Sequence, residues 1–192
     1  MRSFLLLLIA ACFALPAAAE TKFLFKTENW RGEQILLPPG FAPTMKWKGI
    51  EDIRFAPGMF DADSESFFSY ALVFLLDEDA DISTEGVHEQ VLMYYQGLST
   101  AVLKGKGQTT DVSKFELKLG EPETADDVTN IDGTLDWVEP FATQNQQKLN
   151  LQIRIWKHGD KPALFFIVSP QGKDHAIWTE LEEIRDTFKI EG

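Results

Sequence analysis

The chain of 192 residues contains 18 Lys and Arg residues against 30 Asp and Glu residues, which gives a formal charge of -12 at pH 7. This acidic balance disfavours nucleic acid and anionic membrane surfaces as partners, because binding to either requires basic groups that neutralise phosphate. Basic partners or cations stay possible, and the expected partner is an unknown protein or a ligand of the cell envelope. The length favours one domain, which is large enough to bury a hydrophobic core.

The first 19 residues have the pattern of a secretory signal peptide. Arg2 precedes an apolar stretch over residues 4–15, and the small residues at 17–19 form a small-x-small cleavage motif. The apolar stretch is too short to span a bilayer, which takes about 20 residues. We therefore expect an exported protein, periplasmic or secreted, whose mature chain is residues 20–192.

Cys12 leaves one alternative open at this end of the chain. Residues 9–12, Ile-Ala-Ala-Cys, resemble a lipoprotein box, in which the cysteine would carry a lipid anchor. Cleavage after residue 19 instead removes Cys12, which is the only cysteine. The mature chain then forms no disulfide and depends on its apolar core for stability.

The mature chain begins with residues that predict strands. Residues 33–38 and 45–49 are short strand candidates, and a Pro-Pro-Gly turn follows the first of them. Residues 67–76 are almost continuously apolar, which indicates a strand covered on both faces and therefore near the centre of a sheet.

Residues 84–104 predict a long amphipathic helix. Apolar side chains recur there at steps of three and four, the spacing that places them on one face. Ser83 or Thr84 can cap the start of the helix. The predicted apolar stripe consists of Val87, Val91, Tyr95, Leu98 and Val102.

The next part of the chain predicts an antiparallel meander. Residues 115–119 and 148–157 alternate apolar and polar side chains, as in strands with one covered face. Residues 162–169 are continuously apolar and predict a second central strand, joined to 148–157 by a hairpin. Residues 133–141 predict a further strand that pairs nearby.

A second helix is predicted over residues 174–187, with Asp174 as its cap. Its apolar stripe consists of Ile177, Leu181, Ile184 and Phe188. Together the elements predict an α+β fold of one domain, in which the long crossover helix and the C-terminal helix pack on a mostly antiparallel sheet.

The order of these elements resembles the PsbP-like group. The resemblance rests on the lipophilic opening ILLPPGF, the strand-helix crossover, the antiparallel meander and the closing helix WTELEEIRDTFKI. That group has an α/β/α sandwich and includes extrinsic photosystem subunits and small exported bacterial lipoproteins. The resemblance implies such a sandwich here, and a binding or assembly module rather than an enzyme.

The loop over residues 54–66 is the first candidate for a binding site. A Pro-Gly turn is followed by Phe60 and by three carboxylates at alternate positions, Asp61, Asp63 and Glu65. Exposure of Met59 and Phe60 would favour a protein-assembly surface, and burial of both would make the loop a packed plug with a wet acidic rim.

Alternate carboxylates are also the spacing of a calcium loop, so these three are weak candidates for metal ligands. The sixth loop position holds Ser66 instead of glycine, and the twelfth holds Leu72 instead of glutamate. A second cluster, Asp77, Asp79 and Asp81, departs from the pattern in the same way. Neither cluster is an EF-hand, and a cation site and a solvated loop both stay open as interpretations.

The tryptophans provide the second candidate site. Trp156 is in phase with Arg154 on the polar face of its predicted strand, and an exposed indole beside polar donors suits carbohydrate stacking. The alternative is that a helix or loop covers this end of the sheet. Trp30 and Trp47 stand beside basic residues and are further stacking candidates, whereas Trp137 and Trp178 are predicted to belong to the core.

No sequence motif names a reaction or a cofactor. A Gly-x-Ser-x-Gly elbow is absent, and residues 88–92, HEQVL, have leucine where a zinc-binding helix needs its second histidine. The first hypothesis is therefore an exported, non-catalytic binding or assembly module without a cofactor, which uses the 54–66 loop and Trp156. A hydrolase that uses carboxylates around residues 61–65, and a cation- or carbohydrate-binding domain, stay open as alternatives.

Overall fold

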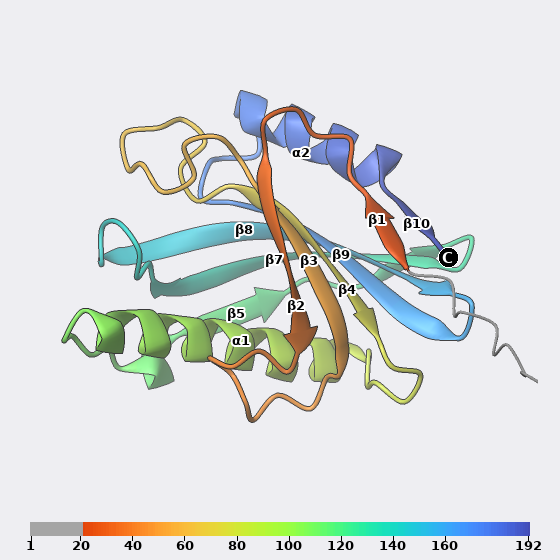
Figure 1. The fold of residues 1–192 in the computed structure, drawn as a ribbon, viewed down its shortest axis with the longest axis horizontal. Helices are drawn as coiled ribbons and strands as arrows, with labels where there is room; N and C mark the ends of the chain where they lie inside the picture. The colour runs from red at the N-terminus through yellow and green to blue at the C-terminus, as the bar shows by residue number, and fades with distance from the viewer. Residues whose placement is uncertain (1–20) are drawn as a thin grey trace, which may run out of the picture.

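The computed structural model describes residues 21–192, so the predicted signal peptide and Cys12 lie outside the described residues. The fold has three layers, with a sheet between α1 on one side and α2 on the other (Figure 1). The helices are α1 (Thr84–Gly105) and α2 (Ala176–Thr187), and η1 (Val112–Lys114) is a short 3-10 turn. Among the described residues, no helix is long and apolar enough to cross a membrane.

The large sheet has eight strands in the order β2-β3-β4-β9-β8-β7-β5, and β6 also pairs with β7. Every pair is antiparallel. A separate two-stranded sheet, β1 with β10, lies beside α2 (Figure 1). The strands are β1 (Lys22–Leu24), β2 (Arg31–Leu37), β3 (Gly49–Phe55), β4 (Tyr70–Leu76), β5 (Glu116–Leu119), β6 (Glu123–Ala125), β7 (Val128–Val138), β8 (Gln146–His158), β9 (Lys161–Ser169) and β10 (Lys189–Glu191).

The predicted α+β fold and its antiparallel sheet are confirmed, and so is the α/β/α sandwich. The two apolar runs form β4 and β9, which pair with each other in the middle of the sheet. All seven residues of β4 are buried, because helices cover both faces. Its alternate side chains divide between two cores: Tyr70 and Leu72 contribute to the core under α1, and Ala71 and Val73 to the core under α2.

The first helix begins as predicted. The Ser83 hydroxyl accepts a hydrogen bond from the Gly86 amide at 3.1 Å, which caps the helix. The second half of the predicted stripe is displaced: Leu98 and Val102 are only half-buried, whereas Leu103 is buried.

The cap of α2 differs from the prediction. His175, not Asp174, caps this helix, and its Nδ1 accepts a hydrogen bond from the Ile177 amide at 3.2 Å.

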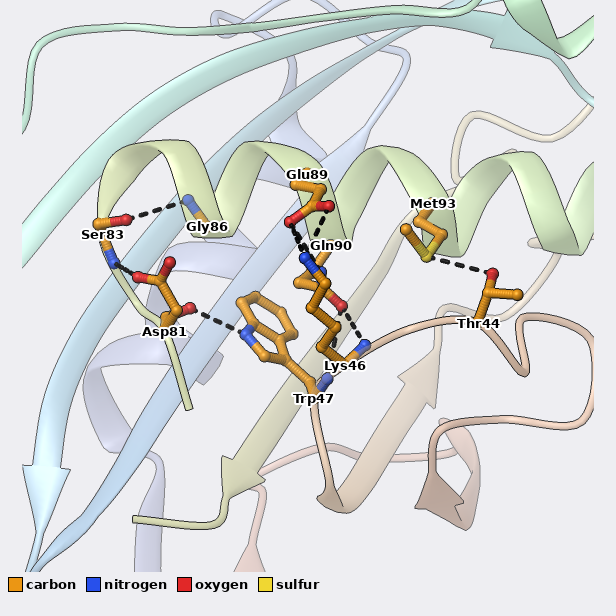
Figure 2. Close-up of polar contacts among 9 residues, drawn as sticks. All are labelled: Thr44, Lys46, Trp47, Asp81, Ser83, Gly86, Glu89, Gln90 and Met93. Atoms are coloured by element: carbon orange, nitrogen blue, oxygen red, sulfur yellow. Dashed lines mark hydrogen bonds and ion pairs between the residues drawn. The ribbon is translucent and has the colours of Figure 1, made fainter. Parts of the chain in front are cut away.

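The strand predicted at 45–49 is wrong for residues 45–48, and only Gly49 belongs to a strand. The segment 45–48 runs along α1 (Figure 2). The backbone amide of Lys46 donates to Oε1 of Gln90 at 2.6 Å, and the Trp47 indole donates to the Asp81 carbonyl at 2.9 Å. A side chain of α1 thus satisfies the backbone that a strand would have paired, and the strand β3 starts only at Gly49.

Candidate functional site

A cavity of about 430 Å³ opens between α1, the β2–β3 edge of the sheet and the loop that follows β3. This volume lies in the range of small-molecule sites, which are mostly apolar with a few polar groups. We call it the aromatic pocket. Its lining consists of the rings of Phe41, Phe55, Phe60, Phe68, Tyr70, Tyr94 and Phe141, the aliphatic side chains of Ile53, Met59 and Leu98, and the β2 residues Arg31, Gly32 and Glu33.

The loop after β3 forms one wall of the pocket. The amide of Phe68 donates to the Met59 carbonyl at 2.9 Å, which closes the loop on itself. Met59 is buried, whereas Phe60 is 52% exposed at the mouth. The Phe60 ring lies 5.8 Å from that of Phe55 and 5.4 Å from that of Phe141. The loop is therefore a packed plug at Met59 and an exposed apolar surface at Phe60.

The loop after β7 forms the facing wall. The carboxylate of Glu139, a fully buried residue, accepts hydrogen bonds from the amides of Phe141, Ala142 and Thr143, with that of Thr143 at 2.6 Å. One carboxylate thus satisfies three consecutive loop amides and fixes the position of the Phe141 ring. The sequence contains no local pattern that predicts this contact.

The edge strand β2 forms the polar rim. Arg31 and Glu33 are exposed, and Arg31 forms no ion pair with another described residue. A neighbouring cavity of about 470 Å³ shares Arg31 and Phe60 with the aromatic pocket and is also lined by Asp61. The aromatic pocket therefore has one guanidinium, one carboxylate and an exposed aromatic ring at this rim, and the carboxylate of Asp61 lies in the neighbouring cavity.

An ionisable group lies behind the pocket wall. Glu51 of β3 is 1% exposed, and one of its oxygens accepts a hydrogen bond from the Tyr94 hydroxyl at 2.9 Å. Its other oxygen, Oε2, has no hydrogen-bond partner. Burial raises the pKa of the Glu51 carboxyl from 4.5 to about 7; the Tyr94 hydrogen bond lowers it, and the charges of Glu33 and Asp52 raise it. Tyr94 thus couples a pocket ring to a carboxyl that titrates near neutral pH.

The structure divides the predicted site residues between two places. Phe60 lines the aromatic pocket, Asp61 lines the neighbouring cavity, and Asp63 and Glu65 are exposed on the same loop. The Asp63 amide donates to Oδ1 of Asp61 at 3.1 Å, a local turn contact. Within residues 21–192, no group of three or more His, Cys, Asp or Glu side chains is placed to hold a metal ion.

Arg154 and Trp156 lie elsewhere, on the face of β8 that α2 covers. Arg154 pairs with Asp186 of α2 at 2.9 Å. Trp156 is half-buried and packs edge-on against Phe188, with ring centroids 6.2 Å apart. Both line a cavity of about 370 Å³ beside the C-terminal segment. The alternation of residues 148–157 correctly placed Trp156 on the same face as Arg154. The side chain that partly covers it is that of Phe188, at the end of α2.

The other tryptophans belong to the core. Trp137 and Trp178 are 2% exposed, as predicted. The stacking role considered for Trp30 and Trp47 is wrong, because these residues are only 9% and 1% exposed. Each indole instead donates an internal hydrogen bond, that of Trp30 to Glu180 at 2.9 Å and that of Trp47 to the Asp81 carbonyl.

No protein-family model matches the chain, and no curated protein matches it. Among solved structures, the fold is similar to cyanobacterial PsbP (CyanoP) from Synechocystis sp. PCC 6803, with a TM-score of 0.42, 9% identity, and coverage of 95% of this chain and 99% of that one. It is also similar to the Ran-binding protein Mog1p of Saccharomyces cerevisiae (TM-score 0.36, 12% identity, 83% and 95% covered). A third similar structure is LpqN of Mycobacterium tuberculosis, which is involved in cell envelope biogenesis. Its TM-score is 0.30 and its identity 8%, with coverage of 90% of this chain and 91% of that one. The PsbP-like order of elements is confirmed as a similarity of fold.

Proposed function

We propose that residues 20–192 form an exported, non-catalytic binding or assembly module that holds an apolar group of its ligand or partner in the aromatic pocket. The observation that carries this proposal is the lining: seven aromatic rings, one of them the exposed ring of Phe60, surround a cavity of about 430 Å³. Transfer of an apolar group from water into such a site is favourable by about 25 cal/mol per Å² of buried apolar surface.

The carboxylates near the pocket support binding more than hydrolysis. A carboxylate hydrolase needs two carboxylates, or a carboxylate and a histidine, that converge on one substrate position. Among the described residues that line the aromatic pocket, Glu33 is the single carboxylate and no histidine is present. The proposal of export rests on the sequence pattern of residues 1–19.

A fluorophore titration tests the proposed function. N-phenylnaphthylamine is uncharged, apolar and fluorescent in apolar sites, so we expect its emission to rise when the purified protein is added. Leu98 projects from α1 into the pocket lining and is half-buried. The variant Leu98→Trp fills the pocket, and we expect it to weaken binding by about tenfold or more.

Leu24→Trp is the matched control, because Leu24 is 41% exposed on β1 and does not line the pocket. This variant should bind the fluorophore as the unmodified protein does. Thermal melting of both variants verifies that each is folded. Absence of binding by the unmodified protein, or equal binding by all three proteins, would overturn the proposed function.

A further inference from the structure

The strand β2 is an edge of the large sheet. It pairs with β3 in continuous register from Arg31↔Phe55 to Leu37↔Gly49, and it is the last strand in the order. Apart from that ladder, no backbone hydrogen bond joins residues 31–37 to another described segment. Natural sheets usually blunt such an edge with charged side chains, proline, a bulge or a covering segment. In β2, RGEQILL, the charged residues Arg31 and Glu33 lie in the first half, and the second half, Ile35 to Leu37, contains neither a charged residue nor proline.

The aromatic pocket opens beside this edge. Three consecutive residues of β2, Arg31 to Glu33, are part of its lining. Glu33 is opposite Ile53 in the ladder, and Ile53 belongs to the core under α1. Side chains alternate between the two faces of a sheet, so every second side chain of a strand added next to β2 would point to the α1 face. One such side chain would stand at the pocket mouth.

The surroundings of the edge also indicate the charge of its partner. Asp61, Asp63 and Glu65 are exposed on the loop that walls the pocket, and Glu33 is exposed on β2 itself. Arg31 is the one basic residue of the pocket lining. With a formal charge of -12 over the whole chain, this surface is complementary to a basic segment.

The far half of the edge adds an apolar contact. Leu36 is 74% exposed, more than Leu24 or Phe60, the other exposed large apolar residues of the described chain. An isolated exposed leucine is ordinary, but this one stands on an edge strand that pairs on one side only, and the other half of that strand lines an aromatic pocket.

We propose that β2 pairs with an extended, basic segment of a partner protein, and that an aromatic side chain of this segment enters the aromatic pocket. The inference rests on the proposed function of that pocket and names its occupant. Backbone hydrogen bonds to β2 supply affinity, and the pocket supplies specificity by accepting one side chain of the added strand.

A set of synthetic peptides tests strand addition. The parent peptide is Lys-Thr-Lys-Phe-Lys-Thr-Lys with a fluorescent label, and binding is measured by fluorescence anisotropy. One analogue is N-methylated at its Thr and Phe residues and the other at its Lys residues. Because only alternate amides of an added strand face its neighbour, we expect one analogue to bind like the parent and the other to lose about tenfold or more in affinity.

The matching change on the protein is Leu36→Lys, which places a charge on the edge. We expect it to weaken binding of the parent peptide by about tenfold. Leu24→Lys is the control, since it alters the net charge equally on a different sheet, and we expect it to leave the affinity nearly unchanged. Equal losses in both variants would reduce the effect to long-range electrostatics and overturn the proposal.

The remaining outcomes separate the inference from the proposed function. Equal affinities of the two N-methylated analogues, or no binding of the parent peptide by a protein that still binds N-phenylnaphthylamine, would overturn strand addition and leave the pocket's proposed function intact. Loss of fluorophore binding as well would overturn both. A dimer that Leu36→Lys converts to monomers would make a second copy of the chain the occupant of β2, and would also overturn the proposal.

Discussion

Replacement of Glu51 by glutamine should change how stability depends on pH. Glu51 is buried under α1, where Tyr94 donates to one carboxyl oxygen and the other oxygen has no partner. The charges of Glu33 on β2 and of Asp52 on β3 further disfavour its ionised form. Glutamine preserves the shape and an acceptor for Tyr94, and it cannot acquire a negative charge.

The magnitude follows from the shift in the pKa of Glu51, from 4.5 in the unfolded chain to about 7 in the folded protein. The folded state retains the proton after the unfolded state has lost it, so the stabilisation is complete below a pH of about 4.5 and is lost as the pH rises through about 7. The full effect is about 3 kcal/mol, and most of it falls between about pH 5 and about pH 8.

Urea unfolding at these two pH values measures this effect. The free energy of unfolding of Glu51→Gln, relative to that of the unmodified protein, should rise by about 2 to 3 kcal/mol between about pH 5 and about pH 8. Glu33→Gln is the control, because Glu33 is exposed and its charge is a lesser cause of the shift in the pKa of Glu51. A difference between Glu51→Gln and the unmodified protein that does not change with pH would refute the reasoning.

Three further predictions concern the rest of the fold and the loop at the mouth. Ser83→Ala removes the cap of α1 and should lower the free energy of unfolding by about 1 kcal/mol in urea titrations; an unchanged midpoint would contradict the capping role. Glu139→Ala leaves three loop amides without their acceptor, so it should cost about 2 kcal/mol or more by the same method and also weaken fluorophore binding through displacement of Phe141. Millimolar calcium should leave the thermal midpoint unchanged, because the exposed loop carboxylates at 61–65 provide few of the six to eight oxygens that calcium takes; a calcium-dependent rise that Asp61→Asn abolishes would contradict this.

The strands that were predicted correctly are those in which the order of apolar and polar residues follows directly from which faces of the strand are buried. The runs at 67–76 and 162–169 are apolar on both faces because each strand lies between two helices, and β4 and β9 are the central pair. The alternation within 148–157 reports a strand with one fully buried face, and β8 extends over that range. In such segments the local sequence contains the information that fixes the element.

The strand β3 was missed because its pattern depends on distant partners. It carries two adjacent carboxylates, Glu51 and Asp52, which read as solvent-exposed residues. In the fold Glu51 accepts a hydrogen bond from Tyr94, 43 positions along the chain, and Asp52 accepts one from Gln34 of the neighbouring strand β2, 18 positions away. Neither contact is visible in the spacing of residues, so a buried strand resembled a polar connection.

The candidate site was found only in part, for the same reason. Phe60 was selected from the loop itself, but other rings of the pocket lining come from distant segments, such as Phe41 before β3 and Phe141 after β7. Trp156 was correctly placed on the same face of β8 as Arg154. The ring that shields it, Phe188, directly follows α2, and the alternation of residues in β8 cannot show that α2 packs there. A pocket forms only when the layers of the fold come together, so residues that are far apart in the sequence give no local pattern that predicts it.

Methyl NMR of the methionine side chains tests the central claim, that the aromatic pocket binds an apolar group, most directly. Residues 20–192 contain methionines at 45, 59 and 93, and of these only Met59 lines the pocket. Titration with N-acetyl-phenylalanine amide should shift the Met59 methyl resonance in a saturable manner and leave those of Met45 and Met93 in place. A stationary Met59 resonance, or equal shifts of all three, would contradict the account.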